Sequence, residues 1–288
     1  MAKIEINGAL LDYADEGAGD PVVFVHGSMS DQRTWEGQSR AFSKRFRVIV
    51  YSRRYHWPNE TIPDGADYVM LEQVDDLEEL IRALEIAPAH LVGNSYGAYI
   101  SLLVAIRRPE LVRSLVLAEP PVIPLFTSVP PKLHQILRLF ATRPRTAVAL
   151  TKFIATGIGP ATAAFRRGDS EAAMQTFLRA VLGREAFERI PEERMEQARS
   201  NVFPAEFLGS GFAPLTADQV RNVQTPTLLV TGERSPSILI RATDRLEELL
   251  PHAERVEITE ASHGMHEDNP QAFDAAVSAF LEKVTQSA

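Results

Sequence analysis

The chain has 288 residues, 45% of them hydrophobic and 24% charged, which excludes a disordered protein and suits one large domain or one domain with an insertion. A formal net charge of −8 disfavours nucleic acid and membrane partners, and the absence of cysteine excludes disulfides, Cys-ligated metals and a thiol nucleophile. The N-terminus has no apolar stretch long enough for a secretory signal, and the longest apolar run, around residues 98–106, is too short to span a bilayer, so we expect a cytoplasmic protein.

The first part of the chain alternates strand patterns with helix patterns. Residues 3–6 and 10–13 alternate in polarity on either side of Asn7-Gly8, a pair that favours a β-hairpin turn. Residues 22–25 are continuously apolar, as in a parallel strand buried on both faces. The segments that follow predict strands at 47–51, 90–92 and 114–118 and helices at 71–84 and 96–108.

This alternation stops at Pro120 and resumes near Val220. The intervening residues hold no strand pattern; their amphipathic periodicity predicts helices at 131–141, 146–156, 170–182 and 185–200. Beyond them, the sequence predicts strands at 227–231 and 255–258 and helices at 239–250 and 270–284.

The predicted elements describe an α/β fold with a mostly parallel twisted sheet and helices on both of its faces. Residues 1–119 and 221–288 would form the core domain, and residues 120–220 a helical cap inserted after the sixth strand. Ligands of such sheets bind beyond the carboxyl ends of the strands. Because the insertion leaves from such an end, we expect the cap to cover the functional site.

Ser95 is the predicted nucleophile. It is the central residue of Gly93-Asn94-Ser95-Tyr96-Gly97, a G-x-S-x-G sequence between a buried strand and an apolar helix. In that context the motif forms a tight, strained turn that presents the serine hydroxyl above the sheet, and the flanking glycines relieve the crowding. The alternative is a structural turn that matches the five-residue pattern by chance.

Two further loops are expected to complete the site. The loop after the strand at 22–25 reads His26-Gly27-Ser28, and the backbone N–H groups of Ser28 and Tyr96 are the predicted oxyanion donors. A serine hydroxyl also needs a base within hydrogen-bond reach. On the loop after the last strand, His263 is favoured because it lies nearer the strand end, whereas His266 is expected to be structural.

This order of motifs resembles the α/β-hydrolase superfamily over essentially the whole chain, and the likeness is strongest to capped small-molecule esterases and carbon–carbon bond hydrolases. The family usually has an aspartate a few residues after Gly232, where this sequence has Ser235. Some members, notably among haloalkane dehalogenases, take a glutamate from the strand that here ends at Glu119. We therefore expect Glu119 to be the acid that orients His263, with Glu233 as the next candidate.

Several other residues at the carboxyl edge are candidates for substrate contacts: His26, Gly27, Arg53 and Arg54. The two arginines could clamp a substrate carboxylate. The alternative is a structural role in which they bind neighbouring loop carbonyls and acids. No metal cluster, phosphate-binding glycine loop or dinucleotide motif occurs in the sequence, so neither a metal nor a cofactor is expected.

The predicted function is acyl transfer to water, with a small and largely apolar ester, lactone or related carbonyl compound as substrate. One alternative is carbon–carbon bond hydrolysis, or a non-hydrolytic reaction, at the same site. Another is a small-molecule binding protein that keeps the fold without turnover, an interpretation that rests on the unusual position of the acid.

Overall fold

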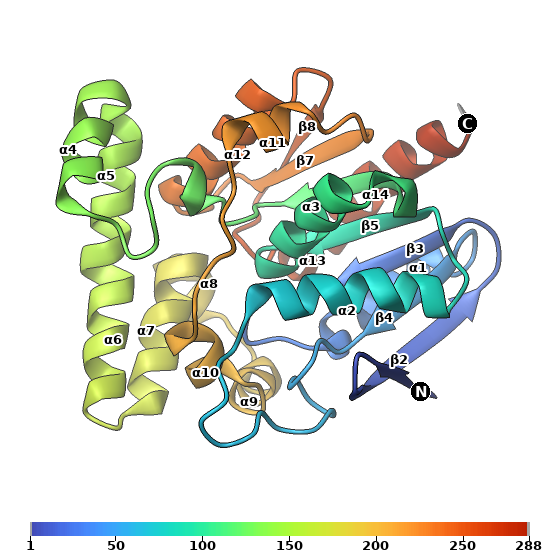
Figure 1. Ribbon diagram of the computed structural model, residues 1–288, viewed down its shortest axis with the longest axis horizontal. Coiled ribbons are helices and arrows are strands. Elements are labelled where there is room, and N and C mark those ends of the chain that lie inside the picture. Colours follow the sequence, from blue (N-terminus) through green and yellow to red (C-terminus); the bar gives the residue numbers. More distant parts are fainter. Residues whose placement is uncertain (1, 287–288) are drawn as a thin grey trace.

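The computed structural model describes residues 2–286, which fold around one eight-stranded sheet (Figure 1). The strands lie in the order β1-β2-β4-β3-β5-β6-β7-β8; β1 and β2 form an antiparallel hairpin, β2 is antiparallel to β4, and β3 to β8 are parallel. Their bounds are β1 (Ala2–Ile6), β2 (Ala9–Gly17), β3 (Pro21–Val25), β4 (Arg47–Tyr51), β5 (Ala89–Asn94), β6 (Val112–Ala118), β7 (Thr227–Gly232) and β8 (Glu254–Ile258). The predicted fold class is confirmed.

Alternate residues of the central strands supply two apolar cores, one on each face of the sheet. In β3, Val22 and Phe24 pack with α1 and α14, whereas Val23 and Val25 pack with α2, α3 and α12. This explains the continuous apolar run in the sequence, because both faces of a parallel strand are covered. The core helices are α1 (Glu36–Phe42), α2 (Met70–Ala83), α3 (Tyr96–Arg107), α11 (Ala217–Arg221), α12 (Ser237–Leu249), α13 (Met265–Asp268) and α14 (Pro270–Gln286).

Between β6 and α11 the chain forms a group of helices, which we call the cap helices, at one end of the sheet, on the left and toward the bottom of Figure 1. Its members are α4 (Leu133–Thr142), α5 (Pro144–Phe153), α6 (Gly159–Arg166), α7 (Ser170–Leu182), α8 (Arg184–Glu188), α9 (Glu192–Arg199) and α10 (Phe203–Leu208). Leu178 of α7, Met195 of α9 and Phe203 of α10 pack with Met29 from the loop after β3. This apolar cluster attaches the helices to the sheet.

The structure corrects the extent of two predicted helices. The helix expected at 146–156 continues to Arg166, because a π-helical turn (Ile154–Ile158) joins α5 to α6. The helix expected at 185–200 is two helices, α8 and α9, and Pro191 lies at the N-cap of the second. Proline has no backbone N–H for a hydrogen bond inside a helix, which accounts for the break.

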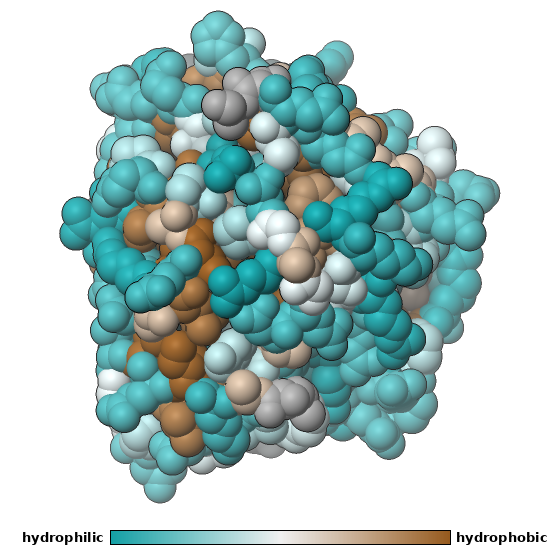
Figure 2. Space-filling model, turned by 90° about the vertical axis from the view of Figure 1, so that its right-hand side faces the viewer, coloured by the Kyte–Doolittle hydropathy of each residue, from teal (hydrophilic) through white to brown (hydrophobic). Residues whose placement is uncertain are grey.

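The surface is not uniform in polarity. Figure 2 shows one face on which hydrophilic residues predominate and hydrophobic ones form a narrow band.

The helical run Pro144–Arg166 has 23 residues and is, by length and composition alone, apolar enough to cross a membrane. In this fold the run contacts α7 and α12, and 28% of its most apolar window is buried.

Candidate active site

Ser95 occupies a strained turn between β5 and α3. Its φ of 53° and ψ of −120° lie outside the regions that residues with a side chain prefer. A Cβ atom on Gly97 would collide with the carbonyl oxygen of Val25, and one on Gly93 would lie 2.5 Å from the Cα of Ala98. Glycine at both positions therefore lets the turn pack tightly against β3 and against the first turn of α3.

His263 and Glu119 form a buried pair. His263 lies on the loop after β8, and Glu119 is the first residue after β6. The Nδ1 atom of His263 is 2.7 Å from Oε2 of Glu119, which is fully buried, while His263 is 5% exposed. The other carboxylate oxygen of Glu119 accepts a hydrogen bond of 3.0 Å from the backbone N–H of Gly232 at the end of β7. Both carboxylate oxygens are thus hydrogen-bonded, and the imidazole ring is held in one orientation.

Neither of the two residues near the family's usual acid position is hydrogen-bonded to His263 in the described part of the chain. Ser235 is buried, and its hydroxyl has no hydrogen-bond partner among the described residues. The Oε2 atom of Glu233 accepts a hydrogen bond of 2.6 Å from the backbone N–H of Glu260. That bond commits the Glu233 carboxylate to the turn after β8.

Two side-chain contacts that the sequence did not predict hold the histidine loop in place. The Asn94 amide donates to the carbonyl oxygen of His263 over 3.1 Å, which links the nucleophile turn to that loop. Asp268 accepts from both the N–H and the hydroxyl of Ser262, at 2.7 and 2.6 Å. Neither contact follows from a motif, because each joins residues that only the fold or a local turn brings together.

His266 lies in the same pocket wall but is packed as a neutral ring. Its imidazole stacks on the indole of Trp35 with a centroid distance of 4.2 Å, and Nε2 lies 3.2 Å from the hydroxyl of Thr34. Burial lowers the pKa of His266 to about 4. A ring so disfavoured from carrying a charge is poorly suited to accept a proton from the nucleophile.

The predicted oxyanion donors border the nucleophile turn. Ser28 lines the pocket together with Gly27, and a Cβ atom on Gly27 would lie 3.2 Å from the Cβ of Ser95. Tyr96 is the first residue of α3, where a backbone N–H has no acceptor inside the helix. In the described residues neither the Ser28 nor the Tyr96 N–H is used in another backbone hydrogen bond.

Arg53 and His26 are structural and do not line the pocket. His26 donates from Nδ1 to the carbonyl of Gly27 over 2.9 Å and accepts at Nε2 from the backbone N–H of Arg53 over 2.9 Å. The Arg53 guanidinium is fully buried and donates to the backbone carbonyls of His26 and Gly27. It also binds the hydroxyl of Tyr68 and the carboxylate of Glu206. Burial alone would lower the pKa of Arg53, but Tyr68 and Glu206 outweigh it and raise that pKa.

Arg54 also lies away from the pocket. Its guanidinium bonds both carboxylate oxygens of Asp76 at 2.6 and 2.8 Å and the carbonyl of Asn7 at 3.2 Å. Of the four predicted substrate contacts, Gly27 alone borders the pocket in the described part of the chain. For both arginines the structural role replaces the carboxylate clamp, because neighbouring acids and carbonyls already use their donors.

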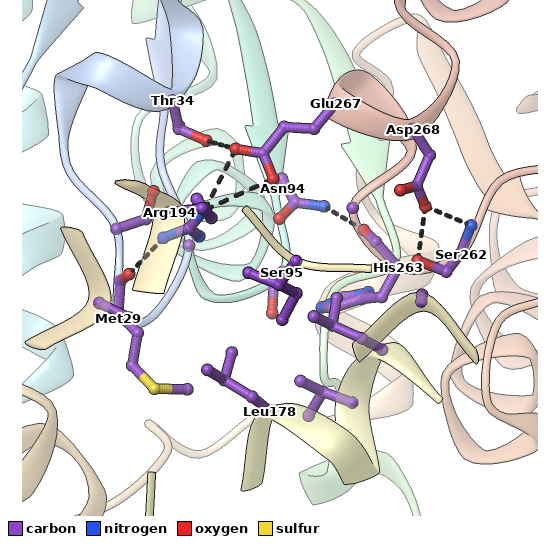
Figure 3. Close-up of a pocket in the computed structure, with 18 of the residues that line it drawn as sticks. Met29, Thr34, Asn94, Ser95, Leu178, Arg194, Ser262, His263, Glu267 and Asp268 are labelled. Atoms are coloured by element: carbon purple, nitrogen blue, oxygen red, sulfur yellow. Dashed lines mark hydrogen bonds and ion pairs between the residues drawn. The ribbon is translucent and has the colours of Figure 1, made fainter. Parts of the chain in front are cut away.

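Ser95 and His263 open into one cavity of about 680 Å³ between the sheet and the cap helices (Figure 3). Figure 3 shows Ser95 near its centre, with Leu178 of α7 facing it from the cap. The cap side is mainly apolar, formed by Phe177, Leu178, Val181, Leu182, Ala186, Ile190, Met195 and Ala198.

One cap residue that the sequence did not flag, Arg194 of α9, brings a positive charge to this cavity. Its guanidinium lies 3.2 Å from the Glu267 carboxylate and donates to the carbonyl of Met29 over 2.9 Å. Glu267 also accepts from the hydroxyl of Thr34 over 2.7 Å. Burial opposes ionisation of Glu267, but Arg194 holds the pKa of its carboxyl below the usual range. In the described residues, no three His, Asp or Glu side chains gather as they would around a metal ion.

Comparison with known proteins agrees with the architecture. Residues 20–270 match the family described as the alpha/beta hydrolase fold. The chain is 24% identical over 281 residues, 96% of its length and 95% of the relative's, to the (E)-2-((N-methylformamido)methylene)succinate hydrolase of Acinetobacter baylyi. It is 25% identical to the 2-(acetamidomethylene)succinate hydrolase of Mesorhizobium japonicum, over 97% of this chain and 94% of that one.

Solved structures show the same fold. A thermophilic esterase from Thermogutta terrifontis superposes with a TM-score of 0.75 at 21% identity, with 98% of each chain covered. The enol-lactonase from Burkholderia xenovorans LB400 gives a TM-score of 0.71 at 20% identity, covering 98% of this chain and 100% of that one. The chain belongs to the alpha/beta hydrolase fold family, and it is a hydrolase.

Proposed function

We propose that the protein is a serine hydrolase that cleaves a small carbonyl substrate through an acyl-enzyme. In this proposal Ser95 is the nucleophile, His263 the general base and Glu119 the acid that orients the base. The observation that carries it is the buried contact of 2.7 Å between Glu119 and His263, a residue that lines the same cavity as Ser95. A carboxylate on Nδ1 leaves Nε2 free to take a proton and stabilises the charge that then develops on the ring.

The proposed reaction has two halves. His263 takes the hydroxyl proton as Ser95 attacks the substrate carbonyl, and the oxyanion that forms accepts hydrogen bonds from the N–H groups of Ser28 and Tyr96. Collapse of this intermediate expels the leaving group, which receives the proton from His263, and leaves an ester on Ser95. Water then attacks that ester with His263 again as base, and the acid product and the free serine are released.

The dimensions and lining of the cavity support a small and largely apolar ester or lactone as substrate. A volume of about 680 Å³ is in the range of sites for single small molecules. The cap residues that face Ser95 are mainly aliphatic, and they would be buried against an apolar acyl or alcohol group.

Arg194 favours a second candidate, hydrolysis of a substrate that bears a carboxylate. Its guanidinium borders the cavity, and arginine binds carboxylates through charge-assisted hydrogen bonds. The two curated relatives compared above are named as hydrolases of substituted succinates, which are dicarboxylates. In this variant of the proposal Arg194 would exchange part of its contact with Glu267 for the substrate.

A panel of chromogenic nitrophenyl esters tests both candidates. Turnover should fall with acyl chain length once the cavity is filled, and Ser95→Ala should lower kcat by on the order of 10⁵-fold. A fluorophosphonate probe should label Ser95, and a folded protein that neither labels nor turns over would be a binding protein instead.

Two nitrophenyl esters of the same chain length, a succinate half-ester with a free carboxylate and an uncharged butyrate ester, test the carboxylate candidate. Arg194→Met should raise KM for the succinate half-ester by about tenfold and leave KM for the butyrate ester unchanged. Equal effects on both esters would remove this candidate.

A further inference from the structure

Charge is distributed very unevenly along this acidic chain. Residues 120–168 contain seven lysines and arginines and no aspartate or glutamate. The other 23 basic residues and all 38 acidic ones lie outside this segment. The net charge of −8 therefore conceals a basic segment of 49 residues, which includes helices α4, α5 and α6.

The same segment exposes large apolar side chains. Nine large hydrophobic residues of the described chain are exposed, and five of them lie between Val129 and Val148. On α4, Leu133, Leu137 and Phe140 are 76%, 61% and 42% exposed. Residues spaced by four and three positions lie on one face of a helix. Helix α4 therefore presents an apolar stripe to solvent, while its opposite side packs through Leu139 against α5 and α12.

Basic residues flank this stripe and are not neutralised. Lys132 and Arg138 are exposed beside it, and on the outer side of α5 the exposed Val148 lies between Arg145 and Lys152, three residues before it and four after. In the part of the chain that the structure describes, none of these four cations forms an ion pair. By contrast, Arg143 in the same segment binds Glu248 of α12 through both carboxylate oxygens, at 2.7 and 2.9 Å.

We propose that the outer surface of α4 and α5 docks on an anionic phospholipid bilayer. Helices that lie in a membrane interface combine apolar side chains, which enter the acyl boundary, with lysine and arginine, which bind acidic headgroups. The two helices lie at the outer edge of the molecule in Figure 1, so a flat surface can reach them. The apolar character of the run Pro144–Arg166 adds to this tendency.

The charge of this surface favours a lipid bilayer over a second copy of the chain as its binding partner. A symmetric dimer through α4 and α5 would place the same basic segment against itself, because such an interface uses one patch twice. Like charges within reach of each other oppose that association. An anionic lipid surface instead complements every unpaired cation on the face, and none of the residues involved borders the cavity that contains Ser95.

Flotation of the full chain with lipid vesicles tests the proposal. At low ionic strength the protein should float with vesicles of phosphatidylcholine and phosphatidylglycerol and stay unbound with phosphatidylcholine alone. Binding should weaken as salt is raised, because salt screens the cationic contribution. Absence of binding to the anionic vesicles at low salt would overturn the proposal.

Two sets of substitutions locate the surface. Leu133→Ser with Leu137→Ser, and separately Arg138→Glu with Arg145→Glu, should each lower the vesicle partition coefficient by about tenfold or more. The matched controls are Leu208→Ser, which changes a leucine that is 59% exposed on α10, and Lys44→Glu, an exposed lysine outside the segment.

The controls should bind as the unaltered chain does, and all variants should keep turnover of a soluble ester and the native circular dichroism spectrum. Binding that survives in both α4–α5 variants would show that this surface is not the docking site. A dimer on size-exclusion chromatography that the leucine substitutions dissociate would assign the apolar stripe to a second copy and also overturn the proposal.

Discussion

At the scale of single residues, the Glu119 carboxylate connects the end of β7 to the histidine loop after β8. It follows β6, yet its Oε1 atom accepts from the N–H of Gly232 at the end of β7, and its Oε2 atom meets His263. A carboxylate therefore lies beside the end of β7, although Ser235 occupies the position after β7 where the family usually has an aspartate. The φ of Glu119 is 48°, a strained value that persists where surrounding contacts enforce it.

Removing the charge of Glu119 should impair catalysis far more than removing that of Glu233. Glu119→Gln keeps the shape but leaves the imidazole ion without its counter-charge, so kcat should fall by about a hundredfold or more. Glu233→Gln should leave kcat within about twofold, because Glu233 does not line the cavity and its carboxylate binds the backbone N–H of Glu260. Steady-state kinetics of the two purified variants on one ester measures the contrast. Similar turnover in both would show that Glu119 does not orient the base.

The site residues that follow strands were predictable from the sequence, whereas Arg194, which lies on a cap helix, was not. Ser95, His263 and Glu119 follow strands, and the ends of parallel strands converge wherever the loops lead, so their meeting was predictable from the sequence. Arg194 has no such signal, because it is one of two arginines on a mostly polar helix, and no apolar stripe marks the side that faces the cavity. Whether a helix cation faces solvent or the cavity depends on how the cap packs, and a single sequence does not encode that visibly.

Among the secondary structure elements, the join of α5 and α6 shows where local rules mislead. Gly157, Gly159 and Pro160 predict the end of a helix, yet the helix continues. The N–H of Gly159 donates to the carbonyl of Ile154, five residues back, which forms the π-helical turn. The wider turn places Pro160 in the first turn of α6, where its missing N–H costs little. Tertiary packing of α6 on α7 then holds the run together.

A buried ion pair between the loop after β4 and α10 adds to the apolar cluster that attaches the cap helices to the sheet. Arg53 and Glu206 are 2.9 Å apart, and their side chains are 0% and 4% exposed. A second connection is polar as well: the Asp31 carboxylate accepts from the amides of Gln197 and Asn201 on and after α9. Both depend on chain segments more than 150 residues apart, which periodicity in the sequence does not reveal.

Breaking the Arg53–Glu206 pair from one side should be costly to stability. Arg53→Met leaves the Glu206 carboxylate buried without its cation, and such losses lower the free energy of unfolding by about 3–5 kcal/mol. Arg53→Met with Glu206→Leu should cost less than the sum of the two single substitutions, because the unpaired charge is gone. Urea denaturation of the three variants gives the coupling energy. Arg184→Met is the control and should change the free energy of unfolding little, since Arg184 and its partner Glu188 are both exposed on α8; additive behaviour in the Arg53 cycle would contradict the prediction.

On the scale of the whole molecule, the net charge does not show where on the surface the charged residues lie. The net charge of −8 predicted no membrane partner, whereas the position of each charge reveals a basic, partly apolar surface on α4 and α5. The alternation of strands and helices, by contrast, is a property of the whole chain and predicted the parallel sheet correctly. Fold class is encoded redundantly in many elements, but a surface is defined by few residues and by the packing behind them.

Buried neutral histidines should make the stability of the whole molecule fall on acidification. Burial lowers the pKa of His90 to about 4, with Arg113 adding to this effect and Asp20 opposing it, and lowers the pKa of His266 to about 4 from an ordinary 6.5. Between about pH 6.5 and 4 the unfolded chain therefore binds protons at these sites and the folded chain does not. The excess proton binding of the unfolded state lowers the free energy of unfolding as the pH falls, by up to about 1.4 kcal/mol per pH unit for each histidine.

Urea denaturation at intervals between pH 7.5 and 4.5 measures this slope, and His90→Gln isolates one contribution. Glutamine does not titrate and can still hydrogen-bond to Ser114, whose hydroxyl lies 2.7 Å from the His90 ring. The variant should be less stable at pH 7.5 because the packing of the ring is lost. Its free energy of unfolding should nevertheless fall less steeply than that of the unaltered chain, by up to about 1.4 kcal/mol per pH unit. Parallel slopes for the two proteins would show that His90 takes up its proton in the folded state as readily as in the unfolded chain, contrary to what its burial implies.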